Sequence, residues 1–132
     1  MKNFKTLLLI TLISSFCLTA QNSNTKKADK HFARFEFVKA AESYNKLVED
    51  GKADAYVYGQ LAESYYNIFN TEAAERYYAK ALETSDKPEM VYKYAQMLKA
   101  NGKYAESNTQ MDKFATMRPA DDRAVAYKKN PD

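Results

Sequence analysis

Residues that commonly carry catalytic or metal chemistry are scarce in this 132-residue chain, which has one histidine and one cysteine. His31 has no second histidine to pair with, so we expect it to be a packing residue rather than a metal ligand or a general base. The 17 Asp and Glu residues are scattered over expected helix faces, and with three glycines the sequence contains no phosphate-binding GxxxxGK[ST] loop. The sequence therefore argues against an enzyme and indicates no cofactor, no metal and no small-molecule substrate.

Tyrosine is the residue type whose chemistry stands out. The chain has 11 Tyr and 7 Phe but no Trp, and all the tyrosines lie after residue 40. Exposed tyrosine gives a large contact area at low entropic cost, which suits a surface that binds peptides or proteins.

The net charge gives no reason to expect a nucleic-acid partner. Without Lys2 and Lys5 of the N-terminal segment, the 20 Lys and Arg residues become 18, against 17 acidic residues.

The elements that must position these side chains are predicted to be helices. Three glycines and three prolines are too few turn signals for a β-protein of this length. Small and aromatic residues recur instead at steps of 34 and 33 residues. The equivalent positions are Ala28, Ala62 and Ala95; His31, Tyr65 and Leu98; Ala40, Ala74 and Ser107; Tyr44, Tyr78 and Met111; and Leu47, Ala81 and Phe114. Two antiparallel helices approach closely where one side chain is small, and an adjacent ring fills the remaining space.

Each copy of this pattern predicts a helix, a turn and a second helix. In the first copy the apolar period that begins at Lys26 includes Phe32 and Phe35, which places both on one helix face. In the second copy, helices are expected over about residues 54–67 and 71–83. The third copy begins at Pro88, a residue tolerated in the first helical turn, and ends before Pro119.

This pattern resembles the tetratricopeptide repeat family over about residues 21–121. The third copy also matches that family in the placing of Gly102, Tyr104 and Pro119. The first copy departs from it, because His31 replaces the usual aromatic residue and Lys27 stands where leucine is common. The resemblance implies an all-α fold of three tandem helix–turn–helix repeats in a short right-handed solenoid, with a short C-terminal capping helix.

The resemblance also implies that a partner binds the concave face, which the first helix of each repeat lines. The residues expected there are Asp29, Phe32, Tyr56, Glu63, Tyr66, Asn67, Tyr92, Gln96 and Lys99. Tyr56 and Tyr66 could instead pack between helices. Some family members grip a terminal carboxylate with Lys, Asn and Arg side chains. Thr25 and Asp29 occupy the first-repeat positions here, so such a clamp is not expected.

The N-terminal segment is typical of a secretory signal peptide. Lys2 and Lys5 precede an apolar run at residues 7–13, and Ala20 is the expected last residue before cleavage. The run is shorter than the ~20 residues of a membrane span, and an uncleaved anchor is the alternative. Cys17 lacks the small preceding residue and the upstream leucine of a lipoprotein cysteine, so it is expected to be a small apolar residue of the signal. The mature chain would then carry no thiol.

The order of segments is similar, more narrowly, to the N-terminal repeat module of OmpA-family envelope proteins of Bacteroidota, one branch of which serves type IX secretion and gliding. The predicted organisation is a signal peptide at 1–20, repeats at 21–54, 55–87 and 88–121, and a capping helix with the start of a linker at 122–132. The closing Asn-Pro-Asp favours a chain that continues into a larger protein.

This narrower resemblance implies an exported scaffold for protein–protein interaction, in the periplasm and associated with the outer membrane. Its partner would be another envelope protein or a peptide segment, with no nucleic acid involved. Membrane association would be indirect, through downstream domains or partners. The alternative is a self-sufficient periplasmic spacer that associates with copies of itself.

Overall fold

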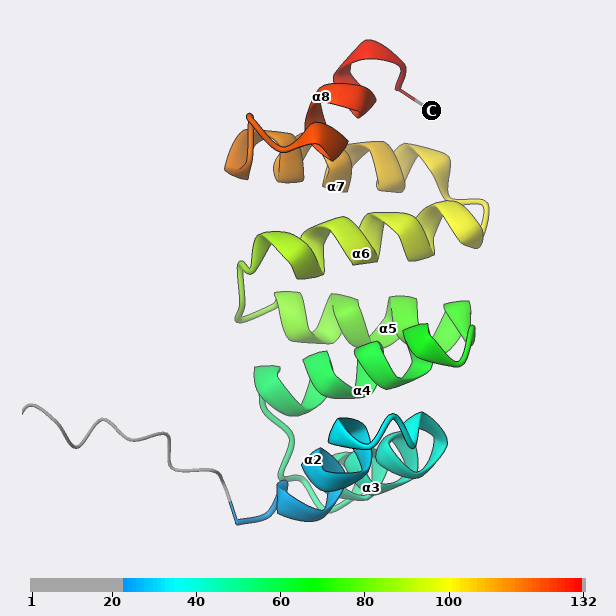
Figure 1. Cartoon of the computed structure of the whole chain (residues 1–132), viewed down its shortest axis with the longest axis vertical. Coiled ribbons are helices and arrows are strands. Elements are labelled where there is room, and N and C mark those ends of the chain that lie inside the picture. Colours follow the sequence, from blue (N-terminus) through cyan, green and yellow to red (C-terminus); the bar gives the residue numbers. More distant parts are fainter. Residues whose placement is uncertain (1–22, 132) are drawn as a thin grey trace, which may run out of the picture.

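The computed structural model describes residues 23–131, and the segment predicted to be a signal peptide lies outside them. Within this range the chain forms helices and no strand, which confirms the all-α fold class. The helices are α2 (Lys26–Ala33), α3 (Phe37–Glu49), α4 (Ala55–Asn67), α5 (Thr71–Leu82), α6 (Pro88–Ala100), α7 (Tyr104–Met117) and α8 (Asp122–Lys129). They stack as an array in which each helix packs mainly on its neighbours in the chain (Figure 1). None of these helices is long and apolar enough to cross a bilayer.

Side-chain caps set the start of several helices. The Asp54 carboxylate accepts the Val57 N–H at 2.9 Å where α4 begins. The Asn70 side chain accepts the Ala73 N–H at 3.1 Å at the start of α5. Each cap satisfies a backbone donor that has no partner inside its helix, so the turns before α4 and α5 are fixed locally.

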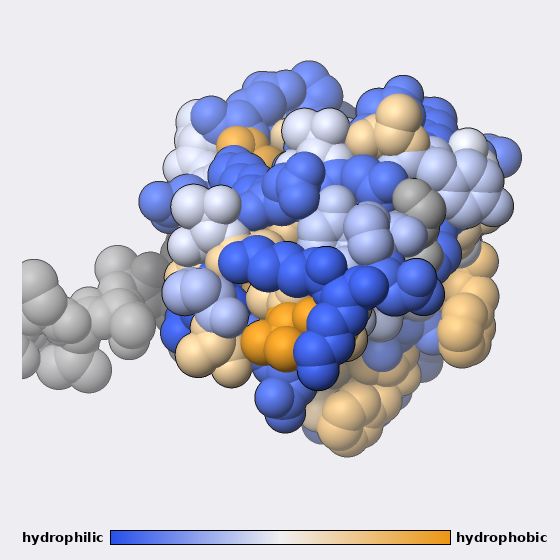
Figure 2. All heavy atoms as spheres, turned by 90° about the horizontal axis from the view of Figure 1, so that it is seen from above, coloured by the Kyte–Doolittle hydropathy of each residue, from blue (hydrophilic) through white to orange (hydrophobic). Residues whose placement is uncertain are grey.

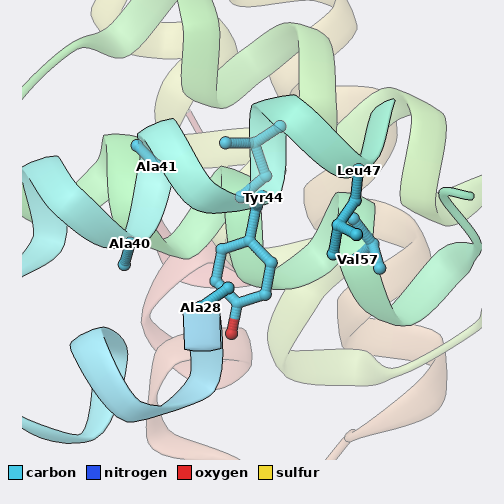
Figure 3. Close-up of a cluster of buried hydrophobic side chains, with 7 residues drawn as sticks. Ala28, Ala40, Ala41, Tyr44, Leu47 and Val57 are labelled. Atoms are coloured by element: carbon cyan, nitrogen blue, oxygen red, sulfur yellow. The ribbon is translucent and has the colours of Figure 1, made fainter. Parts of the chain in front are cut away.

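The core consists of the small and aromatic residues that recur along the sequence. Ala40, Ala74 and Ser107 are completely buried, and the Ser107 hydroxyl donates to the Ala95 carbonyl at 2.8 Å. Tyr44 and Tyr78 are also completely buried. Figure 3 shows the Tyr44 ring pointing from α3 toward Ala28 of α2. The small residues therefore allow the close approach of paired helices, and the rings fill the space beside them.

Phe35 was predicted to be helical, but it lies in the turn between α2 and α3. Phe35 lies beyond α2 with φ of 60°, and Phe69 occupies the equivalent turn with φ of 59°. Their side chains are 79% and 89% exposed, respectively. Gly102 has φ of 79° in the third turn. The apolar period predicted a helical Phe35, but the chain has to reverse there before α3 begins.

The same backbone bond closes all three of these turns. The N–H groups of Glu36, Asn70 and Lys103 donate to the carbonyls of His31, Tyr65 and Leu98 at 3.0, 3.0 and 2.8 Å. A bond that spans six residues at the end of a helix requires a residue in the left-handed region between its ends. Glycine adopts that region freely, whereas an L-residue with a side chain is strained there. Phe35 and Phe69 are thus both strained and exposed.

Replacement of Phe69 by glycine is expected to raise the free energy of unfolding by about 1 kcal/mol, because the strain disappears and almost no contact is lost. Chemical denaturation of the full chain measures this change. Phe69→Ala is the matched control, since it removes the ring but keeps Cβ, and it should leave stability nearly unchanged. A gain in the alanine variant as large as in the glycine variant would contradict the strain at this turn.

The last helix covers the end of the array. Ala124 of α8 is completely buried with Val91 and Phe114, whereas Asp122, Lys128 and Lys129 are exposed. Figure 2 looks down on this end and shows mostly hydrophilic side chains with a few small apolar spots. A polar outer face is what a helical array needs at its end to stay soluble.

Candidate partner-binding face

The residues predicted to bind a partner lie on the first helix of each pair, and the surface formed by α2, α4 and α6 is named the inner face. Asp29 and Phe32 belong to α2, and Tyr92, Gln96 and Lys99 belong to α6. The others, Tyr56, Glu63, Tyr66 and Asn67, belong to α4. Tyr56 and Asn67 are exposed, and the remaining members are partly buried.

Asp29 accepts hydrogen bonds from three hydroxyl groups. Its Oδ1 accepts the Tyr44 hydroxyl at 2.5 Å and the Tyr56 hydroxyl at 2.8 Å. Its Oδ2 accepts the Thr25 hydroxyl at 2.7 Å. Because Tyr44 lies on α3 and Tyr56 on α4, this one carboxylate ties the first helix to the two that follow it.

Glu63 repeats this arrangement one unit further along the chain. Its Oε1 accepts the Tyr78 hydroxyl at 2.8 Å, and its Oε2 lies 2.6 Å from Lys93 Nζ. Tyr78 lies on α5 and Lys93 on α6, so Glu63 also joins the next two helices. In the third unit the equivalent pair is Gln96 and Met111, which makes only a weak amide-to-sulfur contact of 3.9 Å.

The signal for these contacts was present in the sequence. A carboxylate stands 15 residues before a buried tyrosine at Asp29 and Tyr44 and again at Glu63 and Tyr78. Buried hydroxyl groups need partners, so this recurring distance marks a hydrogen bond between two helices. The two carboxylates thus hold the array together, in addition to lying on the predicted face.

The tyrosines that donate to Asp29 and Glu63 keep their protons. Burial, together with the Asp29 carboxylate, raises the pKa of Tyr56 to about 12 and that of Tyr44 further. Burial, reinforced by the charge of Glu63, also raises the pKa of Tyr78 far above its usual range. A phenol that ionised beside a carboxylate would place two negative charges together, so all three hydroxyls stay protonated in more alkaline solution than a free tyrosine does.

The rings of Phe32 and Tyr66 contact other aromatic rings of the chain, and both residues remain partly exposed. The Phe32 ring meets the Phe37 ring edge-on, with centroids 5.3 Å apart. The Tyr66 ring meets Tyr78 in the same way at 6.5 Å, and Lys93 Nζ lies 4.9 Å from the Tyr66 centroid. Tyr66 is therefore partly buried by its own chain, and its contact with a partner stays a prediction.

Tyr92 lies beneath a side chain of the last helix. The Arg123 guanidinium is 4.3 Å from the Tyr92 centroid and 4.9 Å from that of Phe114. Asp121 holds Arg123 through two bonds of 2.9 Å, and Glu89 accepts a third at 3.0 Å. The same guanidinium lowers the pKa of Asp121 to about 2. Sequence reasoning missed this contact, because nothing in the spacing indicates where Arg123 points.

Two hollows open on this side of the array. One, of about 220 Å³, is lined by Ala55, Tyr56, Gly59, Gln60, Thr84, Ser85, Lys87 and Met90. The other, of about 440 Å³, is lined by Tyr92, Gln96, Met111, Arg123, Ala126, Tyr127 and Asn130. Tyr56 stands at the first hollow with 47% of its side chain exposed. Three residues of the first hollow belong to the connection between α5 and α6, namely Thr84, Ser85 and Lys87. They were not among the predicted residues, because a helical spacing pattern cannot indicate residues outside helices.

The arrangement of helices is shared with a solved structure. It superposes on the second TPR domain of the human RPAP3 protein, whose NMR structure is a complex with the HSP70 peptide SGPTIEEVD. The TM-score is 0.66, with 22% sequence identity, over 79% of this chain and 88% of that one. The chain has the fold of a tetratricopeptide-repeat domain. No family model and no curated protein sequence matches it.

Thr25 and Asp29 stand at the first-repeat positions that the sequence resemblance compared with a carboxylate clamp. Here the two side chains bond to each other at 2.7 Å, and Asp29 brings a negative charge. A terminal carboxylate would meet repulsion rather than attraction at this point.

Proposed function

We propose that this chain is a non-enzymatic protein-interaction module that binds a peptide segment of a protein partner on its inner face. The observation that carries the proposal is Tyr56, a half-exposed aromatic ring fixed by Asp29 at the edge of a hollow. A ring already held in place loses little entropy when a ligand packs on it. Gln60 and Met90 in the same hollow offer one polar and one apolar contact.

The peptide complex of the RPAP3 domain supports this proposal, because it shows that a domain with this fold can present a peptide site. The chemistry of recognition here is different. The first-repeat position carries the carboxylate of Asp29, which already accepts three hydrogen bonds. The proposed ligand is therefore an internal segment of a protein, rather than a chain end held by its carboxylate.

The proposed setting is the periplasm, at the outer membrane, as the repeat part of an OmpA-like envelope protein. This part of the proposal rests on the signal-like residues 1–20 and on the narrower resemblance of the repeat sequence. The proposed partner is accordingly another envelope protein.

Selection from a library of random short peptides tests the binding site. We expect selected peptides to lose at least about thirtyfold in affinity for Tyr56→Ala, because an exposed tyrosine at a hollow has the character of a binding hot spot. Tyr104→Ala is the matched control, since Tyr104 is also about half exposed, at 56%, but lies on α7. Titration calorimetry gives both affinities. Equal losses in the two variants, or no selected peptide, would contradict the assignment of the inner face.

Amidation of a selected peptide at its C-terminus tests the mode of recognition. The free and amidated peptides are expected to bind equally, since Asp29 leaves no cationic clamp in the first repeat. A strong preference for the free carboxylate would mean that the peptide is held by its end, against the proposed mode.

A further inference from the structure

The solvent side of α2 carries a run of positive charge. Lys26, Lys27, Lys30 and Arg34 are all exposed, and none of them forms an ion pair with another described residue. Successive helical residues are rotated by about 100°, so the four side chains fall within an arc of about 100°. Ala28, which is buried, lies on the opposite side of the helix. These four residues are named the basic stripe.

A charged helix face is ordinarily a solvated face, but the basic stripe opposes the stability of its own helix. Lys26 and Lys30, and then Lys30 and Arg34, are like-charge pairs four residues apart. Lys26 and Lys27 also stand at the positive end of the helix dipole. The acidic residue of the first turn, Asp29, is occupied by three hydroxyl groups. A bound anionic surface would relieve both repulsions.

An apolar tip adjoins the basic stripe. Phe35 follows Arg34 directly, is 79% exposed and is held in the left-handed region. The Phe37 ring lies edge-on to it at 6.0 Å, and Val38 beyond it is exposed. An exposed apolar side chain beside clustered cations matches a phospholipid surface, where cations meet phosphates and the ring enters the interface.

We propose that the basic stripe and Phe35 form a docking surface for an anionic phospholipid bilayer. The charge is complementary to phosphate headgroups, and a helix of eight residues, about 12 Å long, presents it along one side. The position in the chain agrees with this occupant. Twelve residues separate the stripe from the apolar run at residues 7–13, which is predicted to be directed to a membrane, and α2 is the first helix in the part of the chain that the structure describes. This contact would add a direct membrane interaction to the indirect association that the sequence predicts.

Vesicle co-sedimentation of the full chain tests the proposal. The probes are vesicles of equal parts phosphatidylcholine and phosphatidylglycerol, with pure phosphatidylcholine as the reference for any contribution from residues 7–13. We expect a preference for the anionic vesicles that weakens at high salt. Each cation near an anionic surface is worth roughly fivefold in binding, so the quadruple variant Lys26→Gln, Lys27→Gln, Lys30→Gln, Arg34→Gln should lose at least about tenfold.

Two matched controls separate position from total charge and from exposed aromatic surface. The variant Lys46→Gln, Lys52→Gln, Lys113→Gln, Lys128→Gln removes the same charge from exposed sites elsewhere and should retain the preference. Phe35→Gly should weaken anionic binding, whereas Phe69→Gly should not, although both rings are exposed at equivalent strained turns. Circular dichroism verifies that each variant is folded.

The proposal fails if the stripe variant and its lysine control lose the same amount, or if wild type shows no preference for anionic vesicles. Binding of poly-glutamate that depends on the stripe, without vesicle binding, would also overturn it and would assign the surface to an acidic protein. Peptide binding at Tyr56 is measured separately, so each result bears on its own site.

Discussion

Replacement of Tyr78 by alanine is expected to lower the free energy of unfolding by about 3–5 kcal/mol. The side chain is completely buried between α4 and α5, in a cluster with Ala62, Ala74 and Met97. Its removal leaves a cavity and also deprives Glu63 of one of its two side-chain donors. Since Tyr78 lies in the middle pair of helices, units on both sides lose part of their packing. Denaturant unfolding followed by circular dichroism measures the loss.

Two further variants divide this loss into its parts. Tyr78→Phe keeps the ring and removes only the hydroxyl, which donates to the Glu63 carboxylate, so it should cost about 1.5–3 kcal/mol. Tyr104→Ala removes a tyrosine that is 56% exposed and should change stability by less than about 0.5 kcal/mol. Equal losses for Tyr78→Ala and Tyr104→Ala would refute the central place of Tyr78 in the core.

Replacement of Ala74 by leucine is expected to cost about 1–3 kcal/mol, because the site has no room for a larger side chain. Ala74 is completely buried in the cluster that contains Ala62 and Tyr78. The added atoms would push α5 away from α4, the helix with which it pairs. Thermal unfolding of the full chain measures the effect as a lower midpoint.

Ala105→Leu controls for the helical preference of leucine itself. Ala105 lies on α7 and is exposed, so the same change there should be nearly neutral. An unchanged midpoint for Ala74→Leu would show that α4 and α5 do not meet at this residue.

The burial of Ala74 and Tyr78 could be predicted because close packing of two helices restricts residue size, and size is visible in a sequence. The all-α class followed from the same repeated spacing. Phe35 was misplaced because an aromatic residue that extends an apolar helical period looks like a core residue. The third turn has Gly102 at this position, so only comparison of the three copies could have marked it as a turn.

The contacts on the inner face were harder to predict than the helices. Spacing shows that Asp29 and Tyr56 share a face, but the meeting of their polar ends depends on how far α2 lies from α4. The cover of Tyr92 by Arg123 depends on the angle of α8, a short helix with little apolar surface to orient it. Tertiary distances of this kind are set by the whole core, not by any local pattern.

Arg123 covers one aromatic ring of the inner face, Tyr92, and leaves another, Tyr56, accessible. A ligand that stacks on Tyr92 must compete with a guanidinium held by Asp121 and Glu89. Its apparent affinity is reduced by the fraction of molecules in which that side chain has swung away. A ligand at Tyr56 meets no such competitor, because the Asp29 bond holds the phenol by its edge and leaves part of the ring uncovered. Recognition should therefore begin at the Tyr56 end and reach Tyr92 only for partners that can replace Arg123.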